Sequence, residues 1–193
     1  MVRQREFDED RALDDAMQIF WEKGYKATSL SDLTATMGIQ RPSLYSAFGD
    51  KEKLFEAALR KYTKMHATYI RTKLQNNQSV KEAFRTFFEE LVEDEYKESP
   101  SKGCFCINTM VELAPHDEKF EILTREHQMY LSVIFQETIA TGISSGELDS
   151  SLNAKMLAQT LVVSLIGLTV LLKSRPDRSF VDHSVSMTLS LLK

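Results

Sequence analysis

The chain has little of what catalytic or disulfide-stabilised proteins need. Its 193 residues include seven glycines, four prolines and two cysteines. Cys104 and Cys106 are too close together for an ordinary disulfide framework and lack a second ligand pair for zinc. No glycine-rich phosphate loop, nucleophile elbow or paired-carboxylate arrangement is present, and the four histidines form no metal-binding motif. We therefore expect no enzyme, no metal site and no cofactor.

The composition favours an all-α protein. Glycine and proline are scarce, so long helices are expected, and no alternating Val/Ile/Thr run bounded by turn residues indicates a strand. The content of 42% hydrophobic and 27% charged residues is typical of a soluble globular protein. The N-terminus lacks the apolar core of a secretion signal, so a cytoplasmic protein is expected. Met156–Leu172 is long enough to span a membrane, but scattered polar residues favour a helix buried in a protein interface.

Two short helices around a glycine turn are predicted between Thr28 and Phe55. Ser29 and Asp32 have the spacing of a capping box at the start of the first helix. Gly38 follows the last periodic apolar residue, where a left-handed helix stop costs glycine little. Pro42 lies in the first turn of the second helix, where its missing N–H is tolerated. This layout is typical of a helix-turn-helix DNA reader.

The second short helix exposes groups that suit a DNA groove. Leu44 and Phe48, at i and i+4, can face inward, which leaves the polar residues of the helix facing out. Arginine, hydroxyl and phenol groups hydrogen-bond base edges and phosphates. Lys51 starts the next helix, near the positive end where a phosphate can lie. The predicted DNA-contacting residues are Thr28, Ser29, Gln40, Arg41, Pro42, Ser43, Tyr45, Ser46 and Lys51.

The segment from Asp8 to Phe55 resembles the DNA-binding domain of the TetR/AcrR family of bacterial transcriptional regulators. The resemblance is carried by AMQIFWEKGYKATSLSDL and by MGIQRPSLYSAFGDKEKLF, which match in order and spacing. Gln40 departs from the pattern, because the family usually has Ser or Thr as the cap of this helix. The resemblance implies an N-terminal three-helix DNA-binding domain.

The rest of the chain resembles the regulatory domain of the same family less specifically, through GCFCINTMVELAPHDEKF and GLTVLLKSRPD. The resemblance implies a DNA-binding domain over residues 1–50 and a helical regulatory and dimerisation domain over residues 51–193. It implies a homodimer built from the last two helices, which binds a palindromic double-stranded operator as a repressor. A small apolar effector is expected to release the DNA. The alternative is a DNA-binding dimer without a small ligand, regulated by cysteine oxidation or protein partners.

Two features of the second domain are candidate switches. Large apolar side chains are candidates for an effector pocket, with plain core packing as the alternative for each. Cys104 and Cys106 are candidates for a redox-sensitive pair, and Lys173 could lie near them if the later helix folds back. The alternative is that both cysteines are small buried hydrophobes. The predicted pocket residues are Phe84, Phe88, Phe105, Cys106, Met110 and Met129.

The charge distribution fits a DNA reader within an acidic chain. The formal net charge of the chain is −4, but residues 37–64 carry six basic and three acidic residues, a net charge of +3. The basic excess falls on the predicted recognition helix and on the helix after it. Phosphate contacts are therefore expected in this segment and not over the rest of the surface.

Overall fold

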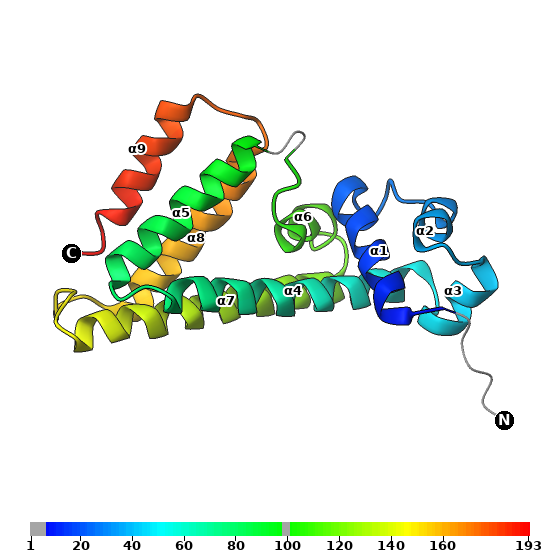
Figure 1. The fold of residues 1–193 in the computed structure, drawn as a ribbon, viewed down its shortest axis with the longest axis horizontal. Coiled ribbons are helices and arrows are strands. Elements are labelled where there is room, and N and C mark those ends of the chain that lie inside the picture. The colour runs from blue at the N-terminus through cyan, green and yellow to red at the C-terminus, as the bar shows by residue number, and fades with distance from the viewer. Residues whose placement is uncertain (1–6, 98–100) are drawn as a thin grey trace.

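A computed structural model describes residues 7–97 and 101–193, and within these ranges every regular element is an α-helix (Figure 1). The expected all-α class is therefore confirmed. The elements, in chain order, are α1 (Glu9–Lys23), α2 (Leu30–Met37), α3 (Arg41–Phe48), α4 (Lys51–Gln75), α5 (Val80–Lys97), α6 (Phe105–Glu112), α7 (Glu118–Ser144), α8 (Ala154–Leu172) and α9 (Arg178–Leu189). Helices α1 to α3 form one end of an elongated molecule, and α5, α8 and α9 form the other (Figure 1).

Helix α1 supplies the floor on which the short helices rest. The Asp8 carboxylate accepts hydrogen bonds from the backbone N–H groups of Asp10 and Arg11 and so caps the helix. Gly24 ends it with a φ of 81°, a conformation that side chains other than glycine rarely adopt. Its buried face carries Ala12, Ala16, Met17 and Phe20. These side chains contact the apolar faces of α2, α3 and α4 in one core.

Helix α4 joins the two ends of the molecule. Its 25 residues span about 37 Å at 1.5 Å per residue. Phe55, Leu59, Tyr62, Met65 and Tyr69 recur along it at helical spacing. The first three are buried, but Met65 and Tyr69 are 52% and 49% exposed. The buried face continues instead through Ala67, Ile70 and Leu74, because a helical face repeats every 3.6 residues and Met65 and Tyr69 fall beside it.

The apolar core of the N-terminal end extends beyond residue 50. It includes Leu54 and Phe55 of α4, Phe105 of α6 and Phe120 of α7. The Phe55 ring meets the rings of Phe105 and Phe120 edge-on, with centroid distances of 5.3 and 5.4 Å. Packing therefore ties the helix-turn-helix region directly to α6 and α7. The predicted domain boundary at residue 50 stays a prediction, and this core extends across it.

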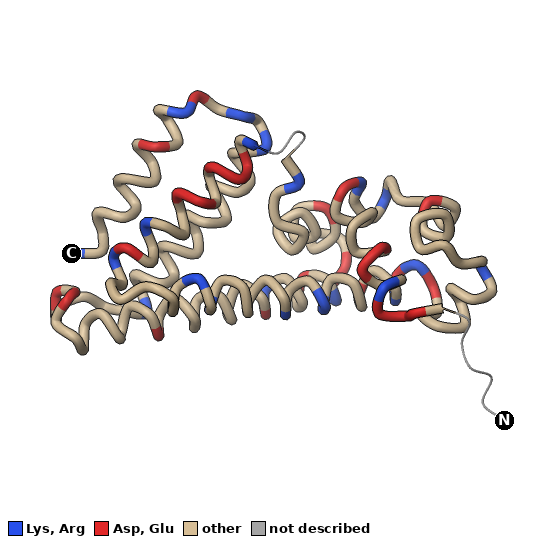
Figure 2. Tube along the Cα trace, viewed as in Figure 1, with Lys and Arg blue, Asp and Glu red and all other residues tan. Residues whose placement is uncertain are grey.

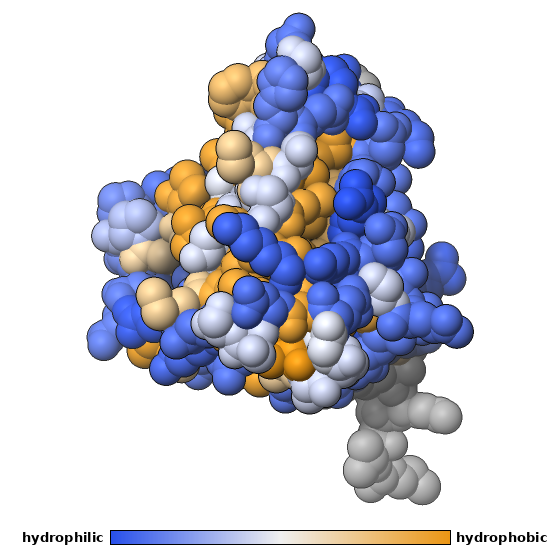
Figure 3. Space-filling model, turned by 90° about the vertical axis from the view of Figure 1, so that its left-hand side faces the viewer, coloured by the Kyte–Doolittle hydropathy of each residue, from blue (hydrophilic) through white to orange (hydrophobic). Residues whose placement is uncertain are grey.

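Helices α5, α7, α8 and α9 make a second core. Phe84 and Phe88 of α5 are buried there together with Phe135 of α7 and the buried residues of α8. Within the described ranges, α8 is the one helix long and apolar enough to cross a membrane, and 44% of its most apolar window is buried inside the molecule. Figure 3 shows apolar surface gathered in patches at this end of the molecule, between hydrophilic side chains.

Candidate nucleic-acid interface and internal cavity

The cap of α2 is the capping box that the sequence predicted. The Ser29 hydroxyl oxygen accepts from the Asp32 N–H at 3.0 Å, and the Asp32 carboxylate accepts from the Ser29 N–H at 2.8 Å. The Asp32 carboxylate also accepts from the Ser29 hydroxyl at 2.7 Å, and this bond together with the one from the Ser29 N–H holds the pKa of Asp32 well below its usual range. Gly38 then ends the helix in the left-handed conformation, with a φ of 64°. Two reciprocal bonds and one glycine thus fix the angle at which the chain enters α3.

Helix α3 presents the predicted polar face. Leu44 is fully buried, while Arg41, Tyr45 and Ser46 are exposed, with the Tyr45 side chain at 49%. Arg41 Nη2 donates to the Ser31 hydroxyl at 2.9 Å, which lays the guanidinium across the gap between α2 and α3. Gln40 occupies the N-cap position without a side-chain hydrogen bond. The first amides of α3 therefore remain open to an acceptor such as a phosphate oxygen.

Three of the predicted DNA-contacting residues are less exposed than the other six. Thr28 is 1% exposed and its hydroxyl donates to the carbonyl of Gly24 at 2.6 Å, so its side chain is buried, and contact between Thr28 and DNA stays a prediction. Ser43 is half-buried. The Lys51 ammonium lies 4.3 Å from the centre of the Tyr25 ring, and burial lowers its pKa. Phosphate binding by Lys51 stays a prediction, and it requires that the Lys51 ammonium is accessible to DNA.

Salt bridges pair some of the basic side chains on α4 with acidic residues, so less positive charge is available near α3 than the count over residues 37–64 indicates. Lys61 forms salt bridges with Asp10 and Asp14 of α1 at 2.8 and 2.6 Å, and Arg60 pairs with Glu56. These two cations are therefore matched by acidic neighbours. Of the other basic residues, Arg41, Lys51 and Lys53 lie on or next to α3, whereas Lys64 lies further along α4.

A cavity of about 180 Å³, open to solvent at the exposed residues Tyr69 and Asp94, lies where α4, α5, α6, α7 and α8 meet. Of the six predicted pocket residues, only Cys106 lies on its wall. Phe84, Phe88 and Phe105 are buried in the two cores, and Met129 is 63% exposed. Met110 is half-buried and accepts a hydrogen bond from the Gln128 amide. These five residues lie away from this cavity, because a large apolar residue packs equally well into a core as against a cavity, and their contact with an effector stays a prediction.

The cavity wall is more polar than the sequence indicates. His66 of α4 and His127 of α7 line it with their ring nitrogens Nδ1 and Nε2 at 3.1 Å from each other. Asp94 and Glu95 of α5 also line it. No spacing rule could have paired the two histidines, because they lie 61 positions apart on different helices. Only the packing of α4 against α7 brings them together.

Helix α6 connects this cavity to the helix-turn-helix region. Cys104 and Cys106, at its N-terminal end, line the cavity. At its other end, the Glu112 carboxylate accepts from the backbone N–H groups of Tyr25 and Lys26 at 3.0 and 2.8 Å. These two residues form the turn between α1 and α2. One eight-residue helix therefore touches both the cavity wall and the segment that leads into the reading helices.

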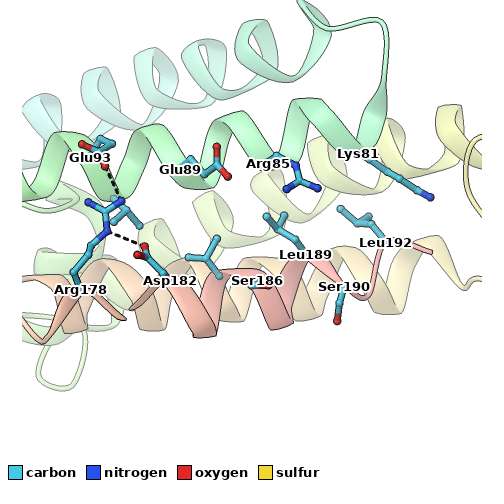
Figure 4. A pocket seen from close by; sticks show the side chains of 12 residues that line it. Lys81, Arg85, Glu89, Glu93, Arg178, Asp182, Ser186, Leu189, Ser190 and Leu192 are labelled. Atoms are coloured by element: carbon cyan, nitrogen blue, oxygen red, sulfur yellow. Dashed lines mark hydrogen bonds and ion pairs between the residues drawn. The ribbon is translucent and has the colours of Figure 1, made fainter. Parts of the chain in front are cut away.

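A surface groove of about 680 Å³ runs between α5 and α9 (Figure 4). Arg178 at the start of α9 bridges Glu93 of α5 at 2.6 Å and Asp182 of its own helix at 2.8 Å, as the dashed lines mark. Lys81 and Arg85 extend from the α5 wall at the far end of the groove. The bridge holds α9 against α5 and so sets the direction in which α9 presents its exposed side.

The fold and the polar face of α3 define a helix-turn-helix DNA-binding protein with a helical body packed against the helix-turn-helix region. Residues 12–58 match the family model described as bacterial regulatory proteins of the tetR family, and residues 80–187 match the tetracyclin repressor-like C-terminal domain. The chain belongs to the TetR family of transcriptional regulators. The expected family is thereby confirmed, as is the class of DNA-binding transcriptional regulators.

Similar proteins agree with this assignment. The chain is 33% identical to the uncharacterised regulator YezE of Bacillus subtilis, over the full length of both proteins. It is 30% identical to the transcriptional repressor ComR of Escherichia coli, over 87% of this chain and 80% of ComR. A triple cysteine mutant of the regulator CifR, solved with a 26-base-pair operator, superposes with a TM-score of 0.85 at 32% identity, covering 99% of this chain and 100% of that one.

Proposed function

We propose that the chain is a repressor that binds a palindromic operator as a homodimer and leaves it when a small molecule enters the cavity between α4, α5, α6, α7 and α8. The observation that carries the proposal is the placement of α6 between the cavity and the turn before the reading helices. The proposed site of action is the cytoplasm, on the DNA of the nucleoid. Both the operator complex of CifR and the repressor ComR, to which the chain is similar, support this reading.

The exposed faces of α8 and α9 support the dimer. Apolar side chains stand out from both helices, and Figure 2 shows the second half of α9 without charge. Gly167 lies on this face of α8, and an added Cβ there would meet nothing within 4 Å, which leaves room for a partner helix. In a two-fold symmetric dimer, the α8–α9 surface of one chain would contact the same surface of the other chain. The two α3 helices would then face the same side of the DNA. The exposed apolar residues are Met156, Val163, Val170, Phe180 and Met187.

The proposed release of DNA depends on α6 moving as a rigid unit. A molecule in the cavity must displace wall atoms, and Cys104 and Cys106 belong to the first turn of α6 or its cap. A short, packed helix moves as a unit, so its other end carries Glu112 and the attached turn with it. That movement would change the angle of α2 and α3 relative to the partner's reading helices. A ligand lowers operator affinity by its preference for the displaced state, typically by 1–3 kcal/mol.

A thermal-shift screen combined with operator binding tests this proposal. At least one small molecule should raise the melting temperature and also weaken binding of the operator, because it binds the folded state and prefers the released conformation. If no compound does both, the alternative of a DNA-binding dimer without a small ligand is the better account.

Cysteine oxidation is the second candidate, favoured by the position of both thiols on α6. Lys173 lies against Gly103, next to Cys104, as the sequence suggested it could. Burial, however, raises the pKa of both Cys104 and Cys106, so the thiols stay protonated and react slowly at neutral pH. Operator binding of a Cys104→Ser, Cys106→Ser double variant before and after oxidant decides the matter. Equal sensitivity of variant and native protein would end the redox hypothesis.

A further inference from the structure

The carboxylates at the wall of the cavity already have cationic neighbours. The Lys173 ammonium lies close enough to Glu95 for the two charges to attract each other, and Glu95 also accepts from the Ser101 hydroxyl. Asp94 is exposed, and its carboxylate lies 4.0 Å from the ammonium of Lys97. A cationic ligand would therefore compete with a lysine for each of these two carboxylates.

Two of the aromatic rings at the wall also have a cation beside them. The Lys102 ammonium lies 5.9 Å from the centre of the Trp21 ring, and the Lys73 ammonium lies 5.7 Å from the centre of the Tyr69 ring. Both distances are within the range of about 6 Å at which a ring face attracts a cation. Neither lysine lines the cavity, so the rings offer it apolar surface against which an uncharged aromatic ligand can pack. The aromatic rings of the lining are those of Trp21, Tyr62, Tyr69 and Phe87.

An anionic ligand would find no cation among the described residues of the wall, since none of them is lysine or arginine. Burial lowers the pKa of His66 to about 3, together with the neighbouring His127, and burial lowers the pKa of His127 to about 4. Both imidazoles are therefore neutral at pH 7. An anion would lose its hydration and lie near Asp94 and Glu95, so its binding would cost free energy.

The polar groups of the wall that keep free hydrogen-bonding capacity are neutral. His66 Nδ1 and His127 Nε2 lie 3.1 Å apart, and one hydrogen bond between neutral imidazoles uses one N–H and one lone pair. The histidine pair therefore keeps one N–H and one lone pair, whichever ring donates. The Gln128 amide donates to the Met110 sulfur and keeps its other N–H and its carbonyl oxygen. His127 and Gln128 are consecutive residues of α7, so imidazole and amide share one stretch of the wall.

A hydroxyl group matches these neutral polar groups, because it both donates and accepts hydrogen bonds. The cavity volume of about 180 Å³ is below the range of about 300–1,000 Å³ that drug-sized ligands fill, so the ligand must be compact. We propose that this cavity binds a compact neutral aromatic compound with one hydroxyl group. The hydroxyl would bond to the pair of His66 and His127 and to Gln128, while the ring would lie between the aromatic side chains. This assignment rests on the proposed function, and it adds a hydroxyl to the apolar effector that the sequence favoured.

The tryptophan on the wall provides a direct test. Trp21 is the single tryptophan of the chain, so its fluorescence reports occupancy of the cavity. At pH 7, the full-length protein is titrated with benzyl alcohol and with ethylbenzene, benzylamine and benzoate, which are similar to it in size. The alcohol should bind at least about tenfold more tightly than each of the others, because ethylbenzene leaves the polar groups of the wall unpaired and the two ions lose their hydration. Equal or tighter binding of any of the others, or no saturable response to the alcohol, overturns the proposal.

Variants of the histidine pair locate the effect. His127→Leu should lose the preference of about tenfold for benzyl alcohol over ethylbenzene, and its retained binding of ethylbenzene would show that the cavity is intact. His127→Gln, which keeps a donor and an acceptor, should retain part of the preference. His116→Leu is the control, since His116 is exposed and lies outside the lining. If His127→Leu does not fold, His66→Leu takes its place in the comparison. An unchanged preference contradicts recognition of the hydroxyl by the histidine pair.

Operator binding separates this inference from the proposed function. If benzyl alcohol binds with the predicted selectivity but leaves operator affinity unchanged, the hydroxyl-binding site stands and control of the operator through this cavity fails. If none of the four molecules binds and another small molecule releases the operator, the proposed function stands and this inference fails. Release of the operator by benzyl alcohol, but not by ethylbenzene at the same concentration, supports both.

Discussion

Replacing Glu112 by glutamine tests the connection between the cavity and the reading helices. The two carboxylate oxygens accept from the N–H groups of Tyr25 and Lys26 at 3.0 and 2.8 Å. In Glu112→Gln, one oxygen becomes an amide nitrogen that faces an N–H group and cannot accept from it. A hydrogen bond to a charged group contributes about 1.5–3 kcal/mol, so the variant should lose about that much free energy of unfolding.

Besides this loss of stability, we expect a larger effect of Glu112→Gln on the degree to which an effector weakens operator binding. The turn after α1 would no longer follow α6, so an effector should weaken operator binding of the variant less than that of the native protein. Fluorescence anisotropy with labelled operator, with and without saturating effector, measures this ratio. Glu126→Gln, at an exposed position of α7, is the control for a lost surface charge. An unchanged ratio in Glu112→Gln would refute transmission through this contact.

Three further changes test other parts of the account. Arg41→Ala should alter base preference, whereas Tyr45→Phe should weaken binding to every sequence alike, as competition between DNA sites can show. Urea unfolding should reveal a stability loss of up to about 3–4 kcal/mol between pH 7 and pH 5, since unfolded His66 and His127 take up protons near pH 6.5 that their buried forms bind only near pH 3–4. Because the folded pKa values are the lower ones, this stability is present above pH 6.5 and is lost as the pH falls; His127→Gln should reduce the dependence. Val163→Glu should leave a monomer in sedimentation experiments, since it places a charge on the exposed face of α8.

The helix-turn-helix region was predictable because its signals are local. The reciprocal bonds of Ser29 and Asp32, the left-handed Gly38 and the burial of Leu44 each depend on residues a few positions apart. Patterns over one or two helical turns therefore identify such elements correctly. These patterns did not show that Thr28 is buried, although its hydrogen bond to the Gly24 carbonyl is equally local.

The cavity was not predictable, because its walls come from five helices and from Trp21 of α1. Hydrophobicity shows that Phe84 and Met129 are candidates for burial, but not that the first lies in a core and the second in solvent. Such placement depends on how long helices cross, which no local pattern encodes. The contact of Glu112 with a turn 86 residues earlier is likewise a product of tertiary packing.

Selection of bound sites from random double-stranded DNA tests the central claim most directly. A dimer reading DNA with two copies of α3 should enrich an inverted repeat whose half-site centres lie about 34–36 Å apart, one helical turn of DNA, or at a related spacing. Alanine at Arg41 should change the bases enriched within each half-site. Enrichment of a single unrepeated site, or of no sequence at all, would contradict the account of a dimeric, sequence-specific DNA reader.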